Sequence, residues 1–252
     1  MFSRANAAWT EHYLGHPDQA LTTIRECTRV ARMLPHPGAL AVANVFAAHL
    51  HLLRSEAGAA AECCRTSLSL ADECGLAFYS IFAQLLAGCA AVQHGKHEEG
   101  VEAIKRGIAS WQSVGSAISV PWFLGELAEG LRLMERCEEA VDVLREALRQ
   151  AQESGQLQFA AELHRIRGMV SVAQGKFLEA ESSFRSAMEM ARKQGARMWE
   201  LRATTSLARL LVKQGKRDEA RAMLAEIYNW FTEGFDTADL KDAKALLDEL
   251  SR

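Results

Sequence analysis

The side chains of this sequence that could do chemistry include eight histidines, six of which form three closely spaced pairs. The pairs are His94 with His97, His49 with His51, and His12 with His16. Metal-binding histidines on a helix prefer to stand four residues apart with a third ligand, and neither of the first two pairs has that spacing or an obvious third ligand. The third pair has the spacing, but Gly15 and Pro17 place His16 in a turn. We therefore predict turn or surface histidines, and no metal site.

Nucleotide chemistry would need a phosphate-binding loop, G-x4-G-K-[ST], whose backbone amides cradle the phosphates and whose hydroxyl reaches magnesium. Each Gly-Lys step of the chain lacks the hydroxyl residue: Phe177 follows Lys176, Arg217 follows Lys216, and His97 follows Lys96. No paired aspartates stand in a strand context, and no Ser–His–Asp or Cys–His arrangement can be proposed from spacing. We predict that the chain is not an enzyme and holds no cofactor.

The six cysteines form no CxxC pair, which argues against a zinc site or a redox motif. They are Cys27, Cys63, Cys64, Cys74, Cys89 and Cys137. We expect them to be reduced thiols that pack as small apolar residues, as free cysteines usually do. No secretory signal is visible near Met1, so a cytoplasmic location is the expectation.

Composition narrows the range of partners. The net charge of −3 and the isoelectric point near 6.3 give no electrostatic reason to expect a nucleic acid or an anionic membrane. No run of eighteen or more apolar residues could form a membrane helix.

The elements that must position any binding residue are most regular in residues 161–194. Gly168 precedes Gly175 by seven residues, and Ala180 and Phe184 follow it by five and nine. These offsets are typical of a tetratricopeptide repeat, in which small residues stand where two helices cross, with a glycine turn between the helices. The segment is predicted to form one helical hairpin.

The same hairpin recurs along the chain in steps of 40 residues. The predicted turn positions are Gly15, Ser55, Gly95, Glu135, Gly175 and Gly215. Seven residues before them stand Ala8, Ala48, Gly88, Ala128, Gly168 and Ala208, and five after them Ala20, Ala60, Gly100, Ala140, Ala180 and Ala220. Nine after them stand Ile24, Cys64, Ile104, Leu144, Phe184 and Leu224. Because every crossing position is Ala or Gly, the helices are expected to approach closely there.

We predict an all-α, right-handed superhelical solenoid with two parts. Residues 1–235 would form six hairpins, and residues 236–252 a capping helix. Asp236 or Thr237 can cap that helix, whose apolar stripe would face the stack while its charged face meets water. The opening helix carries apolar groups at helical spacing where a terminal repeat should be polar, so we expect that a further repeat or domain precedes Met1 in a parent chain.

The sequence from Ala161 to Leu250 closely resembles the C-terminal repeat region of bacterial STAND-type AAA signalling ATPases. The segments that carry the resemblance are HRIRG, SLARL and NWFTEGFDTADLKDAKALLDEL, and a weaker likeness extends back to Met1. In that family the repeats follow an ATPase module, which itself follows a class III adenylate cyclase or a winged-helix DNA-binding domain. The resemblance thus implies a regulatory region without the catalytic parts.

In the resembled repeats, five positions of each first helix face the concave surface. Mapped onto this chain, the resemblance implies a binding surface of Trp9, His12, Tyr13, Phe82, Trp122, Glu129, Arg132, Glu162, Arg165, Arg202, Arg209 and Lys213. Its N-terminal half would be aromatic and its C-terminal half charged, so it could receive a peptide helix or an acidic tail. The competing interpretation is that the aromatics form inter-repeat core and the Arg/Glu pairs are solvated.

The resulting prediction is a non-catalytic module for protein interaction or ligand sensing in a bacterial signalling protein. Its partner would be a protein, a peptide or the upstream domains of a parent chain, with no nucleic acid and no membrane. Two alternatives stay open: a truncated product of a cyclase or ATPase gene that retains nucleotide chemistry, and an oligomerisation scaffold that forms homo-oligomers.

Overall fold

The structure, a computed structural model, describes the backbone of residues 2–251 and the side chains of residues 3–251. This part of the chain contains thirteen α-helices and one short 3-10 helix, with no strand. The helices are α1 (Phe2–Leu14), α2 (Pro17–Met33), α3 (Gly38–Leu53), α4 (Ala57–Glu73), α5 (Ala77–Gln93), α6 (His97–Ser113), α7 (Val120–Leu133), α8 (Cys137–Ser154), η1 (Leu157–Phe159), α9 (Ala160–Ala173), α10 (Phe177–Gln194), α11 (Arg197–Lys213), α12 (Arg217–Tyr228) and α13 (Ala238–Leu250). The predicted all-α solenoid is confirmed. None of the described helices is long and apolar enough to cross a membrane.

The 40-residue period appears directly in the backbone. All six predicted turn positions have a positive φ: 99° at Gly15, 59° at Ser55, 86° at Gly95, 60° at Glu135, 74° at Gly175 and 79° at Gly215. A second set of positive-φ glycines, which the sequence comparison did not use, stands between hairpins: Gly75, Gly115, Gly155 and Gly195. The left-handed conformation ends one helix and starts the next without a steric penalty at glycine.

Small residues at the crossing positions allow the two helices of a hairpin to pack closely. The nine alanines among the twelve are fully buried, as are the large residues nine positions after each turn. At Gly168 an added Cβ would lie 2.4 Å from Cε1 of Phe184, which leaves no room for a methyl group. The aromatic ring of α10 therefore occupies the space that the glycine of α9 leaves free.

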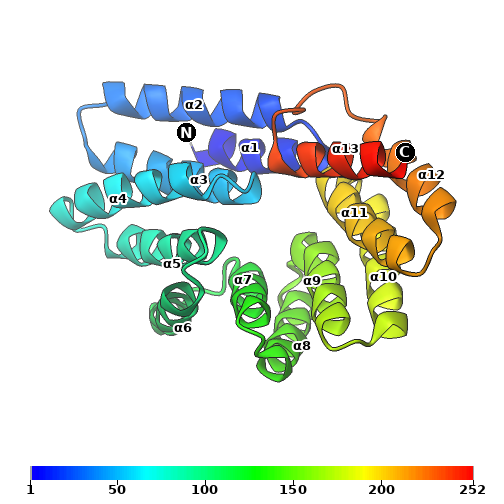
Figure 1. Cartoon of the computed structure of the whole chain (residues 1–252). Helices are drawn as coiled ribbons and strands as arrows, with labels where there is room; N and C mark the ends of the chain where they lie inside the picture. Colours follow the sequence, from blue (N-terminus) through cyan, green and yellow to red (C-terminus); the bar gives the residue numbers. More distant parts are fainter. Residues whose placement is uncertain (1, 252) are drawn as a thin grey trace.

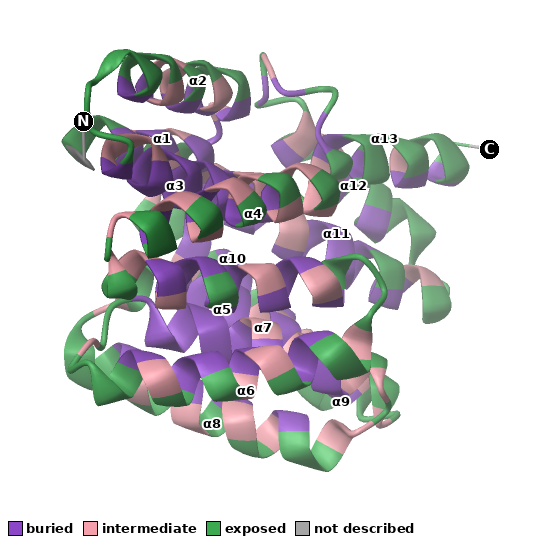
Figure 2. Cartoon of the chain, turned by 90° about the vertical axis from the view of Figure 1, so that its left-hand side faces the viewer, coloured by how far each residue is buried: buried purple, intermediate pink, exposed green. Residues whose placement is uncertain are grey.

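The helices form an inner and an outer layer. Each odd-numbered helix from α1 to α11 contacts the next odd-numbered one. The inner α3 has thirteen buried residues of its sixteen, whereas the outer α4 has four of seventeen. Figure 2 shows the same contrast, with outer helices exposed along one side. Residues 40–53 of α3, the apolar stretch LAVANVFAAHLHLL, therefore form a buried helix of the solenoid.

The hairpins curve so far that the two ends of the chain meet. Figure 1 shows the hairpins following a curved path, with α13 returning to the N-terminal hairpin. The inner helix α1 contacts both its neighbour α3 and the distant α11. Tyr13 of α1 and Trp199 of α11 pack with ring centroids 5.3 Å apart. The solenoid is therefore a closed ring of hairpins.

The connection between α12 and α13 holds the ring closed through hydrogen bonds to the start of α2. The Glu233 carboxylate accepts hydrogen bonds from the backbone amides of Asp18 (3.0 Å) and Gln19 (3.2 Å). In return, Asp18 accepts one from the Gly234 amide at 2.9 Å. Carboxylates at a helix N-terminus satisfy amides that have no partner within the helix. A Cβ added at Gly234 would lie 2.1 Å from Cγ of Pro17, so only glycine fits at this contact.

A buried arginine adds further contacts between the two ends of the chain. Arg54, at the end of α3, is 1% exposed and donates hydrogen bonds to the Pro17 carbonyl at 2.7 Å and to Glu56 at 2.8 Å. Asp236 stands 3.7 Å from the same guanidinium. Thr237 caps α13, its hydroxyl accepting from the Leu240 amide at 3.4 Å. The segment GFDTADL, on which the family resemblance partly rests, thus supplies several of the contacts between the C-terminal part of the chain and the first two hairpins.

Candidate functional site

The inner helices line two cavities, one at the N-terminal ends of α9 and α11 and one further along the same two helices. One, of about 480 Å³, is called here the acidic cavity. It is lined by Ser55, Val92, Gln93, Gly95, His97, Glu126, Glu129, Leu133, Glu162, Arg165, Ile166, Arg202, Thr205, Ser206, Arg209, Asp239 and Asp242. The other, of about 550 Å³, is called the uncharged cavity and is lined by Asn6, Trp9, Thr10, Tyr13, Leu14, Ile118, Ser119, Gln156, Gln158, Phe159, Gln194, Ala196 and Trp199.

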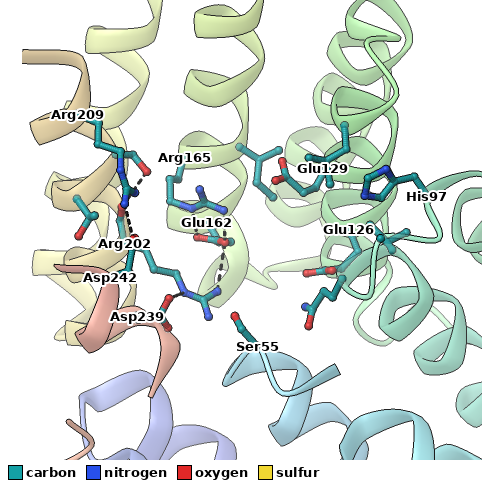
Figure 3. A pocket seen from close by; sticks show the side chains of 17 residues that line it. Ser55, His97, Glu126, Glu129, Glu162, Arg165, Arg202, Arg209, Asp239 and Asp242 are labelled. Atoms are coloured by element: carbon teal, nitrogen blue, oxygen red, sulfur yellow. Dashed lines mark hydrogen bonds and ion pairs between the residues drawn. The ribbon is translucent and has the colours of Figure 1, made fainter. Parts of the chain in front are cut away.

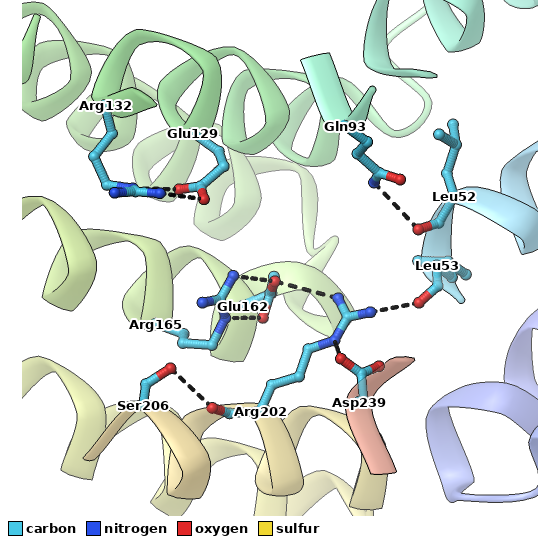
Figure 4. A network of polar contacts seen from close by, with 10 residues as sticks. All are labelled: Leu52, Leu53, Gln93, Glu129, Arg132, Glu162, Arg165, Arg202, Ser206 and Asp239. Atoms are coloured by element: carbon cyan, nitrogen blue, oxygen red, sulfur yellow. Dashed lines mark hydrogen bonds and ion pairs between the residues drawn. The ribbon is translucent and has the colours of Figure 1, made fainter. Parts of the chain in front are cut away.

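An ion-pair network at one side of the acidic cavity links α9, α11, α13 and the end of α3 (Figure 4). Arg165 donates two hydrogen bonds of 2.8 Å to Glu162 on its own helix α9. Arg202 of α11 reaches Glu162 at 3.4 Å, Asp239 of α13 at 2.9 Å, and the carbonyl of Leu53. Burial alone would raise the pKa of Glu162, but Arg165 and Arg202 outweigh it and hold that pKa below its usual range. Glu162 is therefore a charged, structural member of the site.

Glu126 of α7 differs from the other carboxylates of the acidic cavity. Figure 3 shows its side chain directed into the cavity, opposite Arg202 and Ser55. No arginine or lysine among the described residues pairs with it, whereas Glu129 and Glu162 each have an arginine partner. Burial, together with the negative charges of Glu162 and Glu129, raises the pKa of Glu126 to about 7. The cavity thus presents a carboxyl group that forms no ion pair with the described residues, since Arg202 and Gln93 only partly offset the rise in its pKa.

The charges that line the acidic cavity do not balance. Five carboxylates face it against three guanidiniums, those of Arg165, Arg202 and Arg209. Each guanidinium is already engaged, Arg209 with Asp242 and the other two in the network described above. One oxygen of Asp239, Oδ2, is buried without a hydrogen-bond partner. An unpaired acceptor and a carboxylate without a cation together favour a positively charged or hydrogen-bond-donating group.

The two cavities are separated by an aromatic and cationic stack. The guanidinium of Arg202, which lines the acidic cavity, lies 5.0 Å from the ring centroid of Trp199, which lines the uncharged one. Tyr13 packs against Trp199, and burial raises the pKa of its hydroxyl well above the usual value. Contact between α1 and α11 therefore forms the wall between the cavities.

The aromatic half of the predicted binding surface belongs largely to the core. Phe82 is 5% exposed and Trp122 3% exposed, and both pack around the buried His49. His12 is fully buried as well. The prediction of turn or surface histidines is therefore wrong for these two, because inner helices are enclosed on nearly all sides by the neighbouring hairpins. Burial lowers the pKa of His49 to about 3, which keeps it neutral.

Of the other paired histidines, His16 and His94 lie at turns, whereas His51 lies in the last turn of α3 and His97 begins α6. His164 lies within α9 and is partly buried. His51 forms a hydrogen-bonded pair with Glu56, and His16 lies 6.0 Å from the ring of Trp230. No group of three His, Cys, Asp or Glu side chains within residues 3–251 could hold a metal ion. All six cysteines are free, and Cys27, Cys64 and Cys89 are buried.

The charged half of the predicted surface is largely brought together. Glu129, Glu162, Arg165, Arg202 and Arg209 line the acidic cavity. Arg132 makes two hydrogen bonds of 2.8 Å to Glu129. Lys213, at the end of α11, is exposed and does not line the cavity. Of the aromatic half, Trp9 and Tyr13 line the uncharged cavity instead.

Three acidic residues of the cavity were missed. Glu126 occupies the same place in the 40-residue unit as Ile166 and Ser206, and all three line the cavity. The signal that could have located Glu126 is that the equivalent position in the next repeat holds the apolar Ile166. Asp242 was expected on the solvent face of α13 and Asp239 only in its first turn, but both line the cavity, where Asp239 pairs with Arg202 and Asp242 with Arg209. Nothing in the local pattern of α13 indicated this placement.

Two family profiles match parts of the chain. The tetratricopeptide repeat profile matches residues 159–233. The profile of anaphase-promoting complex subunit 5 matches residues 2–56 and 122–166. Together with the fold, the first match identifies a tetratricopeptide-repeat region in this chain. A curated protein of Rhizobium meliloti, described as uncharacterised, is 29% identical over 133 residues, which is 52% of this chain and 13% of that protein.

Several solved structures share the fold. NprR in complex with its cognate peptide NprX superimposes with a TM-score of 0.71 at 13% identity, over 93% of this chain and 66% of that one. A Rap protein complexed with competence and sporulation factor gives 0.69 at 10% identity, over 98% and 73%. TPR-like repeats related to a kinesin light chain of Podosopora anserina give 0.53 at 17% identity, over 77% and 95%. The chain thus spans only a small part of the curated relative and about two thirds of NprR.

Proposed function

We propose that this chain is a non-catalytic tetratricopeptide module that binds a protein or peptide on the inner face of the ring. Tetratricopeptide arrays present concave surfaces for extended binding partners. Two of the structures that share the fold are described as complexes, one with a cognate peptide and one with competence and sporulation factor. These likenesses support the class of partner, and the cavity chemistry supports a more specific proposal.

The observation that carries the proposal is the excess of carboxylates in the acidic cavity. Glu126 has no cationic partner among the described residues, and Asp239 keeps an unpaired oxygen. A bound lysine, arginine or amino terminus would supply the missing positive charge and N–H donors. The proposed ligand group is therefore cationic, in place of the acidic tail that the predicted arginines suggested, since those arginines already have carboxylate partners.

We further propose that the module serves a larger bacterial signalling protein in the cytoplasm. The resemblance to the repeat regions of STAND-type ATPases supports this context, and the Rhizobium meliloti relative is itself much longer than the matching region. Residues 1–235 would act as six hairpins and residues 236–252 as the helix that caps them. A ligand on the inner face would bias the packing of the hairpins and so change an attached catalytic or DNA-binding module.

A peptide array tests the ligand class directly. Arrayed peptides of matched length and hydropathy, with lysine or arginine in one half and glutamate in the other, are probed with the labelled chain. We expect capture of the cationic half only, with affinity reduced about tenfold in a Glu126→Gln/Asp242→Asn variant. Neither substitution removes a partner of the buried network.

The control is an Asp142→Asn variant, which neutralises an exposed carboxylate of the outer helix α8 and should bind as the unchanged chain does. Equal capture of both halves of the array, or capture that the double variant leaves unchanged, would contradict the proposal. ATP binding or cyclic AMP formation by this chain would instead favour the alternative of a nucleotide-dependent enzyme.

A further inference from the structure

The uncharged cavity has the dimensions and lining of a small-molecule site. Its volume of about 550 Å³ lies within the range of pockets that enclose a drug-sized ligand. Three aromatic side chains from opposite ends of the chain form one wall: Trp9, Tyr13 and Trp199. Apolar side chains stand open at the same cavity, since Leu14 is 41% and Ile118 62% exposed. Covering this apolar surface would contribute free energy to binding.

The opposite wall consists of three connections between hairpins, and hydrogen bonds of glutamine side chains join these connections. Gln156 accepts a hydrogen bond of 2.7 Å from the Ser119 amide and donates one of 3.0 Å to the Ala117 carbonyl. Gln194 donates one of 2.7 Å to the Leu157 carbonyl. Each glutamine joins one connection to the next around the ring. The cavity wall is therefore a fixed structure held by side-chain hydrogen bonds between successive repeats.

The chemistry of the lining restricts the ligand. None of the thirteen described residues that line this cavity is charged, although 24% of the residues in the chain are. The polar groups of the lining are amides and hydroxyls, from Thr10, Ser119 and Gln158 among others. A charged ligand would lose its hydration here without gaining a partner of opposite charge. Aromatic walls with neutral polar groups at the rim suit an uncharged ring system.

The cavity also depends on closure of the ring. Asn6, Thr10 and Leu14 come from α1, whereas Trp199 comes from α11 and Ala196 from the turn before it. If the ends of the chain separated, the aromatic wall would split between them. A ligand in the cavity therefore binds the closed ring in preference to an opened one, and such a ligand shifts the equilibrium toward closure.

We propose that the uncharged cavity is a binding site for a neutral aromatic small molecule, separate from the acidic cavity, and that its occupation stabilises the closed ring. The proposal does not depend on the peptide-binding function. A peptide could occupy the acidic cavity with or without a ligand here, because the Arg202–Trp199 stack stands between the two spaces.

The probe is N-phenyl-1-naphthylamine, a neutral aromatic dye that fluoresces on leaving water, with 1-anilinonaphthalene-8-sulfonate as its anionic counterpart. We expect the neutral dye to bind with one site per chain and at least about tenfold more tightly than the anionic one. Thr10→Trp, on the exposed face of α1, should fill the cavity and weaken binding of the neutral dye about tenfold or more.

Thr22→Trp is the matched control. Thr22 lies on the exposed face of α2 and, like Thr10, donates its hydroxyl hydrogen to the carbonyl four residues before it. This variant should bind the neutral dye as the unchanged chain does. Gln158→Trp fills the cavity from the opposite wall and repeats the test if Thr10→Trp fails to fold. Equal affinity for the two dyes, or neutral-dye binding unaffected by both filling variants, would overturn the site.

Closure is tested by hydrogen exchange of the Asp18 and Gly234 amides, whose hydrogen bonds span the two ends of the chain. Neither residue lines the cavity. Saturating N-phenyl-1-naphthylamine should slow exchange of both amides about threefold or more, because it binds the closed ring. Dye binding without this slowing would refute the stabilisation of the closed ring.

Discussion

The guanidinium of Arg202 on α11 donates a hydrogen bond to the backbone carbonyl of Leu53 at the end of α3, 149 residues earlier in the chain. The same side chain reaches Glu162 and Asp239, so a single arginine joins four elements (Figure 4). In an open solenoid each repeat contacts only its neighbours. Here, contacts between the first and last hairpins connect the two ends and create both cavities.

Arg202 should therefore contribute more to stability than an arginine on the same helix that pairs at the surface. Arg202→Met leaves Asp239 buried without its cation and is expected to cost about 3 kcal/mol of unfolding free energy. Arg209→Met removes an exposed pair with Asp242 and should cost less than about 1 kcal/mol. Urea denaturation of both variants measures the difference. Equal losses would mean that the network is not a structural feature.

Closure of the ring should depend on the absence of a side chain at residue 234. Gly234 and Gly215 have nearly equal φ angles, 78° and 79°, so alanine is strained by a similar amount at each. Only at Gly234 would the new Cβ collide with Pro17; at Gly215 no atom lies within 4 Å. Hydrogen exchange of the Asp18 amide should accelerate at least about tenfold in Gly234→Ala and remain unchanged in Gly215→Ala. Unchanged exchange of the Asp18 amide in both variants would refute the inference that this loop holds the ring closed.

The crossing glycine of the fifth hairpin should tolerate no methyl group. Gly168→Ala would place Cβ 2.4 Å from Phe184 and is expected to lower the unfolding free energy by about 1–3 kcal/mol, despite the higher helix propensity of alanine. Gly58→Ala, in a helix with no atom within 4 Å of the new Cβ, should be neutral or stabilising. Thermal unfolding compares the two variants. A stabilised Gly168→Ala would show that the helices can separate at this crossing.

The fourth turn should gain stability from glycine. Glu135 has a φ of 60°, a conformation that costs an L-residue about 1–2 kcal/mol, while glycine adopts it freely. Glu135→Gly should therefore raise the unfolding free energy by about 0.5–1 kcal/mol after the entropy cost of glycine. Glu135→Ala keeps the strain and serves as the control. If alanine and glycine proved equally stabilising, loss of the carboxylate would be the cause instead.

Glu126 should make stability depend on pH near neutrality. Its pKa of about 7 in the folded chain lies above the ordinary 4.5, so the folded state binds this proton more tightly than the unfolded state. The resulting stabilisation is complete below pH 4.5 and is lost as the pH rises through 7. Glu126→Gln should thus be more stable than the unchanged chain at pH 8 by about 3 kcal/mol, and similar to it at pH 4.5. Thermal melts from pH 4.5 to 8.5 give the profile, and a pH-independent difference would contradict the assignment.

The repeat itself was readily predicted from sequence. Alanine and glycine at Gly168, Ala180 and their equivalents act within one hairpin, where the packing partner lies only a few residues away. Each turn position had a positive φ even where glycine was replaced, at Ser55 and Glu135, because the length of the helices on either side sets where the chain must reverse. Only the glycines between hairpins, such as Gly155, were overlooked.

The candidate site was predicted less well. Glu162 and Arg165 share one face of one helix, so their position could be inferred from spacing. Sequence analysis assigned Phe82 and Trp122 to the binding surface, with core packing as the competing interpretation, and expected His49 at a turn or the surface. All three are buried, since an inner helix has a neighbour on nearly every side and few of its positions stay open. Asp239 could not be located at all from the periodicity of α13.

The sequence by itself determined the hairpin, its period and its all-helical class, because these depend on residues close together along the chain. The tertiary structure alone decided that the ring closes, which cavities form and which charges remain unpaired. The physical reason is cumulative: a small rotation at each of five hairpin junctions adds up to bring Asp18 to Gly234, 216 residues away. No local sequence pattern shows the summed rotation. The contacts that form when the two ends meet nevertheless determine which residues face the ligand.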